Sequence, residues 1–209
     1  MENSLHYEVL DEKRRDFLPL LVNFKENFYL AGGTGLALLL GHRASLDFDF
    51  FTKKSFDPKK MFEKCLSIFQ NFNIKKIQEE KDTLTIIVGQ DIKISFFAYP
   101  YDLVDDLVES EYFKIASMTD IGCMKLSAIT GRSTMKDYVD IYFILQKISL
   151  KELLLKLEAK FPYIDRMLVL KSLSYFEDLE PEAINYKNRM DVDFERIKDF
   201  LVSEAQKIL

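Results

Sequence analysis

Two short groups of residues have types and spacing that suit phosphate chemistry. The first is Gly32, Gly33 and Thr34, which join the apolar run "FYLAG" to a second apolar run, "TGLALLLGH". The first run predicts a short buried strand and the second a buried helix. Glycines at such a junction let the backbone turn tightly near a ligand, and the free N–H groups of the helix start favour phosphate. The Thr34 hydroxyl adds a donor. Alone, however, glycines between a strand and a helix are often purely structural.

The second group is Asp47 and Asp49 in "LDFDFF", where the alternation predicts a strand. Both carboxylates project from one strand face, and Leu46, Phe48 and Phe50 are predicted on the opposite face, toward the core. Adjacent carboxylates repel and raise each other's pKa unless a cation lies between them. A hard divalent ion, Mg²⁺ or Mn²⁺, suits such oxygen ligands where phosphates also bind. Taken alone, the pair is better explained as the polar face of an edge strand.

The spacing of the two groups is more specific than either group by itself. "GGT" is followed by twelve residues and then "DFD", so a phosphate-binding turn and a carboxylate pair flank one helix. This pattern looks like the signature of the polymerase-β-type nucleotidyltransferase superfamily. Together with "MKLSAITGRSTMKDYVDIYFIL", it resembles the AbiEii/AbiGii-type nucleotidyltransferase toxin family over roughly residues 28–146. The resemblance implies a nucleotidyltransferase fold, a nucleoside triphosphate substrate with Mg²⁺ and a bacterial toxin–antitoxin or phage-defence role. It also implies a cognate antitoxin protein and an acceptor such as tRNA or another RNA.

The second motif places four charges toward the buried side of two predicted helices. Lys125 and Arg132 fall within the apolar stripe of a helix over 119–130, and Asp137 and Asp140 share the apolar side of the next helix. Isolated charges there are very costly, so they either form a buried ion-pair network or line a wet cleft. Beside the glycine and aspartate signature we favour the cleft. Lys125 and Arg132 then supply positive charge to the triphosphate, and Asp137 or Asp140 orients Lys125 or activates the acceptor.

One position departs from the superfamily pattern, which has a third carboxylate on a later strand. The best matching strand is "DIKISFFAY", and Ser95 occupies the position aligned with that carboxylate. Asp91 substitutes for it only if the register slips. A single metal ion on Asp47 and Asp49 is therefore expected, with deprotonation assigned to a helical aspartate. The departure also motivates an alternative function, a catalytically inactive nucleotide-binding or partner-binding protein on the same fold. A purely structural interaction protein is a third hypothesis.

His42 and Arg43 lie just before the aspartates and offer two interpretations. They could meet a phosphate, or they could serve the C-terminus of the preceding helix, where the dipole favours cations.

The elements that must position these residues predict an α+β protein. A mixed nucleotidyltransferase-type sheet flanked by helices is expected over 1–116, followed by a helical C-terminal region over 117–209. Asp57 and Pro58 open one helix. Strands are expected in "IKKIQ", "TLTIIVG" and "DIKISFFAY", and later helices near 119–130, 136–148, 150–160, 164–174 and 193–208.

Composition limits the remaining possibilities. The 209 residues are 48% apolar with 18 Phe and no Trp, typical of a globular protein whose core is rich in Phe. The net charge of −5 argues against a general nucleic-acid coat. Cys65 and Cys123 are expected to be free core residues in a reducing compartment. With no signal peptide and no run of about eighteen apolar residues, we expect a cytoplasmic protein without a membrane span.

Overall fold

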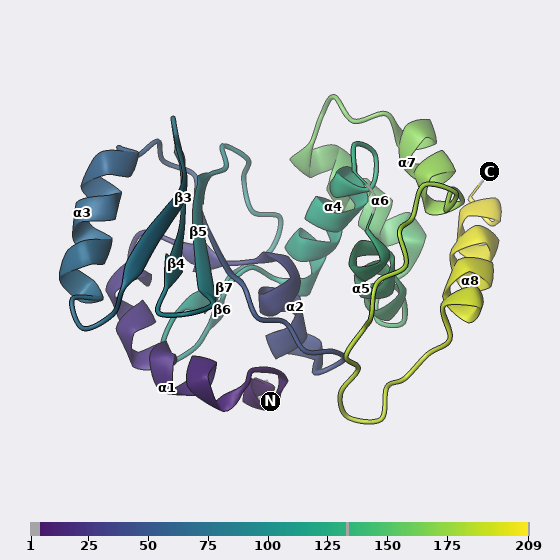
Figure 1. Cartoon of the computed structure of the whole chain (residues 1–209). Helices are drawn as coiled ribbons and strands as arrows, with labels where there is room; N and C mark the ends of the chain where they lie inside the picture. The colour runs from purple at the N-terminus through teal and green to yellow at the C-terminus, as the bar shows by residue number, and fades with distance from the viewer. Residues whose placement is uncertain (1–4, 133, 209) are drawn as a thin grey trace.

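The computed structural model describes residues 5–132 and 134–208. Figure 1 shows a twisted sheet with α1 and α3 on one side, and a group of helices from the second half of the chain beyond its other side. Helix α2 (Gly32–Leu40) lies between the two parts and packs against both the sheet and the later helices. The predicted α+β class is confirmed.

The described residues form one mixed sheet of seven strands in the order β3-β4-β5-β2-β1-β7-β6. At its centre β2 pairs in parallel with β5 and antiparallel with β1. The three strands expected after residue 70 are confirmed as β3, β4 and β5. The sequence patterns did not reveal β6 and β7, because two residues are too few to show alternation. The strands are β1 (Tyr29–Leu30), β2 (Phe48–Thr52), β3 (Ile74–Glu80), β4 (Thr83–Val88), β5 (Ile92–Ala98), β6 (Val108–Glu109) and β7 (Lys114–Ile115).

Capping residues explain where the helices begin. Asp57 accepts hydrogen bonds from the backbone N–H groups of Lys59 and Lys60, and Pro58 occupies the first helical position of α3. Later helices start after Ser117, Thr134, Ser149 and Asp165, each of which accepts a backbone N–H. All strands precede residue 116. The remaining helices are α1 (Glu12–Leu21), α3 (Pro58–Ile68), α4 (Met118–Ala128), α5 (Met135–Leu145), α6 (Leu150–Lys160), α7 (Arg166–Leu173) and α8 (Phe194–Gln206), with short 3₁₀ turns η1 (Tyr7–Val9) and η2 (Val22–Phe24).

The two faces of the central strands differ, as the alternation predicted, although the face of Asp49 and Ser95 also carries Phe51 and Phe97. On one face Phe50 pairs with Phe96, and the Phe96 ring lies 4.8 Å from Phe24 and 5.3 Å from Phe28. Phe48 is also fully buried. The prediction for Leu46 was wrong, since it precedes β2 and is 42% exposed. The opposite face carries the polar residues described below.

Two further predictions concern the cysteines and the absence of a membrane-spanning helix. Cys65 and Cys123 are free and buried, as expected. Among the described helices, none has both the length and the apolar character needed to cross a bilayer.

The phenylalanine cluster should dominate the stability of the sheet. We expect Phe96→Ala to lower the free energy of unfolding by about 3–5 kcal/mol, because it removes a fully buried ring and leaves a cavity. Tyr163→Ala is the control, since Tyr163 is 102% exposed and its loss should change the value by about 0.5 kcal/mol or less. Urea unfolding followed by circular dichroism measures both. Equal losses would contradict the packing described here.

Candidate active site

A cleft of about 1290 Å³ lies where the sheet meets the helical part. It is open to solvent and both parts of the chain contribute to its walls. Of the nine residues to which the sequence analysis gave a binding or catalytic role, seven line it, namely Gly32, Gly33, Asp47, Asp49, Lys125, Arg132 and Asp137. The two others, Thr34 and Asp140, lie behind its walls.

The glycine turn fits tightly between two functional side chains. Gly32 has φ of 64°, and a Cβ atom there would lie 3.0 Å from Asp49 Oδ2. A Cβ atom on Gly33 would lie 2.7 Å from Arg43 Nη2, closer than real contacts allow. The residue before α2, Ala31, provides no side-chain cap. The first N–H groups of this helix therefore remain available to an anion at the cleft.

Thr34 has a different place from the one expected. It is 1% exposed, its hydroxyl lies 2.8 Å from Ser45 Oγ, and it donates to the carbonyl oxygen of Asp47. The hydroxyl therefore fixes the segment that leads into β2, and it does not point to a ligand. Ser45, which lines the cleft, was missed by the sequence analysis.

The two aspartates lie side by side at the start of β2, with Asp47 just before the strand and Asp49 on it. Lys93 Nζ on β5 lies 3.2 Å from Asp47 Oδ2. Burial and the neighbouring Asp47 charge raise the pKa of Asp49, while Lys93 and a hydrogen bond from Ser95 act in the opposite direction. Two carboxylates with oxygens facing an open cleft, one of them destabilised in its charged form, suit a divalent ion.

Ser95, which the sequence analysis aligned with a third carboxylate, lies beside Asp49 in the sheet. Ser95 pairs directly with Asp49 across β2 and β5, and Thr85 Oγ1 on β4 lies 3.3 Å from Ser95 Oγ. Asp91 does not take its place. It lies in the turn before β5, is 56% exposed and pairs with Lys13 and Arg14. The register slip considered from the sequence does not occur.

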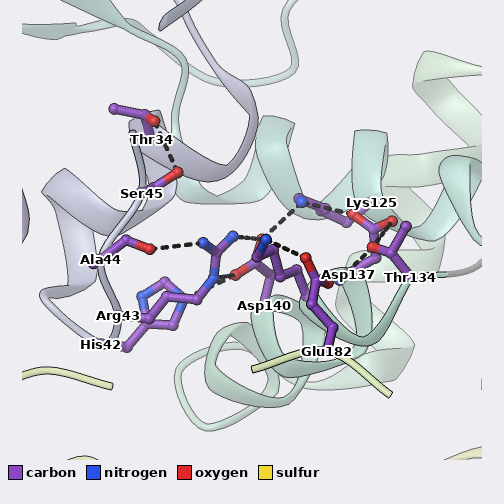
Figure 2. A network of polar contacts seen from close by, with 11 residues as sticks. Thr34, His42, Arg43, Ala44, Ser45, Lys125, Thr134, Asp137, Asp140 and Glu182 are labelled. Atoms are coloured by element: carbon purple, nitrogen blue, oxygen red, sulfur yellow. Dashed lines mark hydrogen bonds and ion pairs between the residues drawn. The ribbon is translucent and has the colours of Figure 1, made fainter. Parts of the chain in front are cut away.

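Behind the cleft, one buried carboxylate gathers several donors (Figure 2). Asp140 on α5 accepts Arg43 Nε at 2.7 Å and Arg43 Nη2 at 2.8 Å, and its Oδ2 lies 2.7 Å from Lys125 Nζ. Lys125 also donates to Asp137 Oδ1 at 2.7 Å, and Thr134 Oγ1 donates to Asp137 Oδ2 at 2.8 Å. The network therefore joins the segment after α2 to helices α4 and α5.

The charged side chains of this network shift one another's pKa values. Burial opposes ionisation of Asp140, but Lys125 and Arg43 hold its pKa well below the ordinary value. Lys125 is likewise desolvated, yet Asp140 and Asp137 raise its pKa. Both groups are thus charged, and their partnership offsets the cost of burying them.

His42 lies fully buried beside this network. Its Nε2 is 2.9 Å from Asp140 Oδ1, and its ring packs 5.0 Å from Phe143. Among the described residues its Nδ1 has no hydrogen-bond partner. Burial lowers the pKa of His42 despite the opposing effect of Asp140. For both His42 and Arg43 the structure shows a contact with a carboxylate of α5, which neither interpretation considered.

Arg132 was predicted on the apolar stripe of a helix, and this was wrong. Helix α4 ends at Ala128, and Arg132 lies exposed in the following loop, although it does line the cleft. Beyond α4 the backbone N–H groups of Thr130 and Gly131 donate to carbonyl oxygens three residues back, so the chain forms a turn before Arg132.

Comparisons with known proteins agree with this architecture. The family model described as "Nucleotidyl transferase AbiEii toxin, Type IV TA system" matches residues 20–207. The chain is 35% identical over 208 residues to an uncharacterized protein of Aquifex aeolicus (strain VF5), a match that covers 96% of this chain and 98% of the other.

Two solved structures share the fold. A candidate nucleotidyltransferase from Helicobacter pylori superposes with a TM-score of 0.63 at 20% identity and covers 95% of both chains. The nucleotidyltransferase toxin MenT4 from Mycobacterium tuberculosis H37Rv gives a TM-score of 0.59 at 14% identity, over 93% of this chain and 82% of its own. The nucleotidyltransferase-type sheet expected from the sequence is confirmed.

The buried network leads to a prediction about Asp140. Asp140→Asn should lower the free energy of unfolding by about 3–5 kcal/mol, because Arg43 and Lys125 lose the charge that compensates them. Asp105→Asn is the control, since the Asp105–Lys156 pair is more than a third exposed and contributes about 1 kcal/mol or less. Chemical unfolding at pH 7 measures both, and equal effects would contradict the role given to Asp140.

His42 should give the protein a specific pH dependence. Its folded pKa is lowered, so below about pH 6.5 the unfolded chain binds a proton that the folded chain does not. The free energy of unfolding should therefore fall as pH drops from 7 to 5, by at most about 1.4 kcal/mol per unit from this group. His42→Gln keeps an N–H near Asp140 and should flatten the slope. An unaltered slope in His42→Gln would refute the assignment.

Proposed function

Because the chain belongs to the AbiEii family of nucleotidyltransferase toxins, we propose that it transfers a nucleoside monophosphate from a nucleoside triphosphate to an acceptor hydroxyl. The observation that carries this proposal is the meeting of the Gly32–Gly33 turn, the aspartate pair and Lys125 on one cleft. In the reaction the acceptor oxygen bonds to the α-phosphorus and the bond from that phosphorus to the leaving oxygen breaks. The hydroxyl proton passes to a base, and pyrophosphate departs.

The glycine turn is the proposed binding site of the triphosphate. Gly32 and Gly33 present the N–H groups of the α2 start to the cleft, where the helix dipole favours negative charge. Arg43 packs against Gly33 and lines the same wall, and Ser45 adds a hydroxyl there. The exposed Arg132 lies on the helical side and adds positive charge to the cleft. Thr34 contributes indirectly by holding Ser45 and the Asp47 backbone.

Asp47 and Asp49 are the proposed ligands of one divalent ion, Mg²⁺ or Mn²⁺. When bound, the ion neutralises the two carboxylates and stabilises negative charge on the triphosphate. The proposal is supported by the raised pKa of Asp49 and by the space above it that only a glycine at position 32 leaves open.

The acceptor side is assigned to the helical residues. Lys125 is a buried cation on this wall, held by Asp137 and Asp140. Of the two aspartates, Asp137 has surface in the cleft and Asp140 has none. We therefore assign proton acceptance to Asp137 and the positioning of Lys125 and Arg43 to Asp140.

The biological setting follows from the family. As a toxin of this family, the chain is proposed to act on RNA, with tRNA as the first acceptor to examine, and to be restrained by a cognate antitoxin protein. An acceptor hydroxyl would approach from the helical wall, where Lys136 and Arg132 line the cleft near Asp137.

A second function is favoured by one specific observation. Because Ser95 stands in register with Asp49, the strand that completes the carboxylate set in the superfamily offers only a hydroxyl. A protein that binds nucleotide or a partner without turnover would fit that position.

The proposed function predicts that Asp49 is essential. Asp49→Asn should lower transfer of label from α-³²P nucleoside triphosphates to total bacterial RNA by about 100-fold or more, because the metal ligand set and its charge are weakened. The assay contains Mg²⁺ or Mn²⁺ and resolves labelled RNA on a gel. Asp102→Asn is the control, since Asp102 is 81% exposed and does not line the cleft.

Two outcomes would decide against parts of this proposal. Undiminished labelling by Asp49→Asn would remove the aspartate pair from the site. Wild-type protein whose melting temperature rises with triphosphate and metal, but which labels no acceptor, would favour the binding protein instead.

A further inference from the structure

Lys93 is a cleft residue that neither the glycine turn nor the helical network includes. It lies on β5 two residues before Ser95, on the same strand face, and its Nζ is 3.2 Å from Asp47 Oδ2. Since β5 runs parallel to β2 with Ser95 beside Asp49, the position of Lys93 falls beside Asp47. Its side chain is 44% exposed, so the ammonium can change partners without disturbing the core.

Three other basic residues of this cleft form ion pairs of a different kind. Arg43 and Lys125 are bound to Asp140, which is fully buried and out of reach of any ligand in the cleft. Lys136 is paired with Glu182, outside the proposed metal site. The partner of Lys93 is instead Asp47, one of the two proposed metal ligands. With a divalent ion held by Asp47, the Lys93 ammonium would lose this partner and be free to contact another group in the cleft.

The charge balance of the site gives this exchange a function. Three strand carboxylates would carry a formal charge of about −3 and call for two divalent ions. Here Asp47, Asp49 and Lys93 together carry a formal charge of about −1, because Ser95 is neutral and Lys93 is cationic. One divalent ion already makes this group attractive to a triphosphate, and a second ion would meet the repulsion of the ammonium.

We propose that the Lys93 ammonium takes the electrostatic role of a second divalent ion: it binds triphosphate oxygens while a single ion occupies Asp47 and Asp49. This inference rests on the proposed function and assigns Lys93 as a triphosphate-binding residue. In the free protein Lys93 neutralises Asp47, and in the loaded protein it contacts the substrate.

The assignment requires two effects of opposite sign when the charge is removed. Lys93→Met should bind Mn²⁺ alone more tightly, on the order of tenfold, because a cation beside the ligand oxygen is gone. The same variant should bind inorganic triphosphate in the presence of Mn²⁺ more weakly, on the order of tenfold, because an ammonium contact is lost. Isothermal titration calorimetry measures both affinities, and electron paramagnetic resonance of Mn²⁺ counts the ions bound. Inorganic triphosphate avoids any dependence on base preference.

Two matched variants make the test specific. Lys156→Met removes a lysine of similar exposure, 39%, whose Nζ lies 2.8 Å from Asp105, and it should change neither affinity. Lys93→Arg keeps the charge and should retain triphosphate affinity within about threefold. Melting temperatures establish that each variant is folded.

The outcomes separate the inference from the function on which it rests. The inference is overturned alone if Lys93→Met changes both affinities in the same direction, if it changes neither, or if the wild-type chain binds two Mn²⁺ ions with triphosphate. If the wild-type chain binds neither Mn²⁺ nor triphosphate, the proposed function fails and the inference fails with it. The inference and the proposed function are both supported if Lys93→Met binds Mn²⁺ alone more tightly and triphosphate more weakly, and if the chain binds one Mn²⁺ ion.

Discussion

The bond between Asp140 and Arg43 determines the geometry of the whole cleft. Arg43 follows α2 closely in the chain, and its guanidinium packs on Gly33 so tightly that no side chain fits between them. By accepting from both Nε and Nη2, Asp140 fixes that guanidinium and thereby the wall of the cleft beside the Gly32–Gly33 turn. The same carboxylate holds Lys125. One buried residue of α5 therefore sets the distance between the sheet side and the helical side of the cleft.

The C-terminal segment reinforces this arrangement from outside. The backbone N–H of Ala44 donates to the carbonyl oxygen of Asn185 at 2.8 Å, and that of Lys187 donates to the carbonyl oxygen of His42 at 3.0 Å. A segment after α7 therefore pairs with the backbone on both sides of Arg43. Asn185 and Glu182 reach the cleft from this segment. The side chains of Arg43 and Asp140 are 3% and 0% exposed, and an ion pair so poorly hydrated is stronger than one in water.

The sequence left two interpretations open for the inward charges of the helical motif, and the structure combines them. Asp140 belongs to a buried network, whereas Asp137 belongs to the same network and also borders the cleft. The helical wheel could place Asp137 and Asp140 on one side of α5, because that depends on local periodicity alone. It could not show that the partners of Asp140 include His42 and Arg43, since those contacts join positions nearly a hundred residues apart. Thr34 and Arg132 were misplaced for related reasons: the first depends on the path of the segment before β2, the second on where α4 ends.

The register between β2 and β5 shows which residues of the two strands lie side by side, which the alternation of the sequence could not. The pattern "DFD" predicted two carboxylates on one face, and the pairing of β2 with β5 adds Ser95 and Lys93 to that face. A row of carboxylate, hydroxyl and hydroxyl runs across Asp49, Ser95 and Thr85, while a lysine stands beside Asp47. In such a row the aspartates are less crowded by negative charge than three carboxylates would be, yet Asp49 is still harder to ionise than a free aspartate. In the proposed function a single divalent ion would relieve this repulsion between carboxylates, and the displaced Lys93 would then supply positive charge to the substrate.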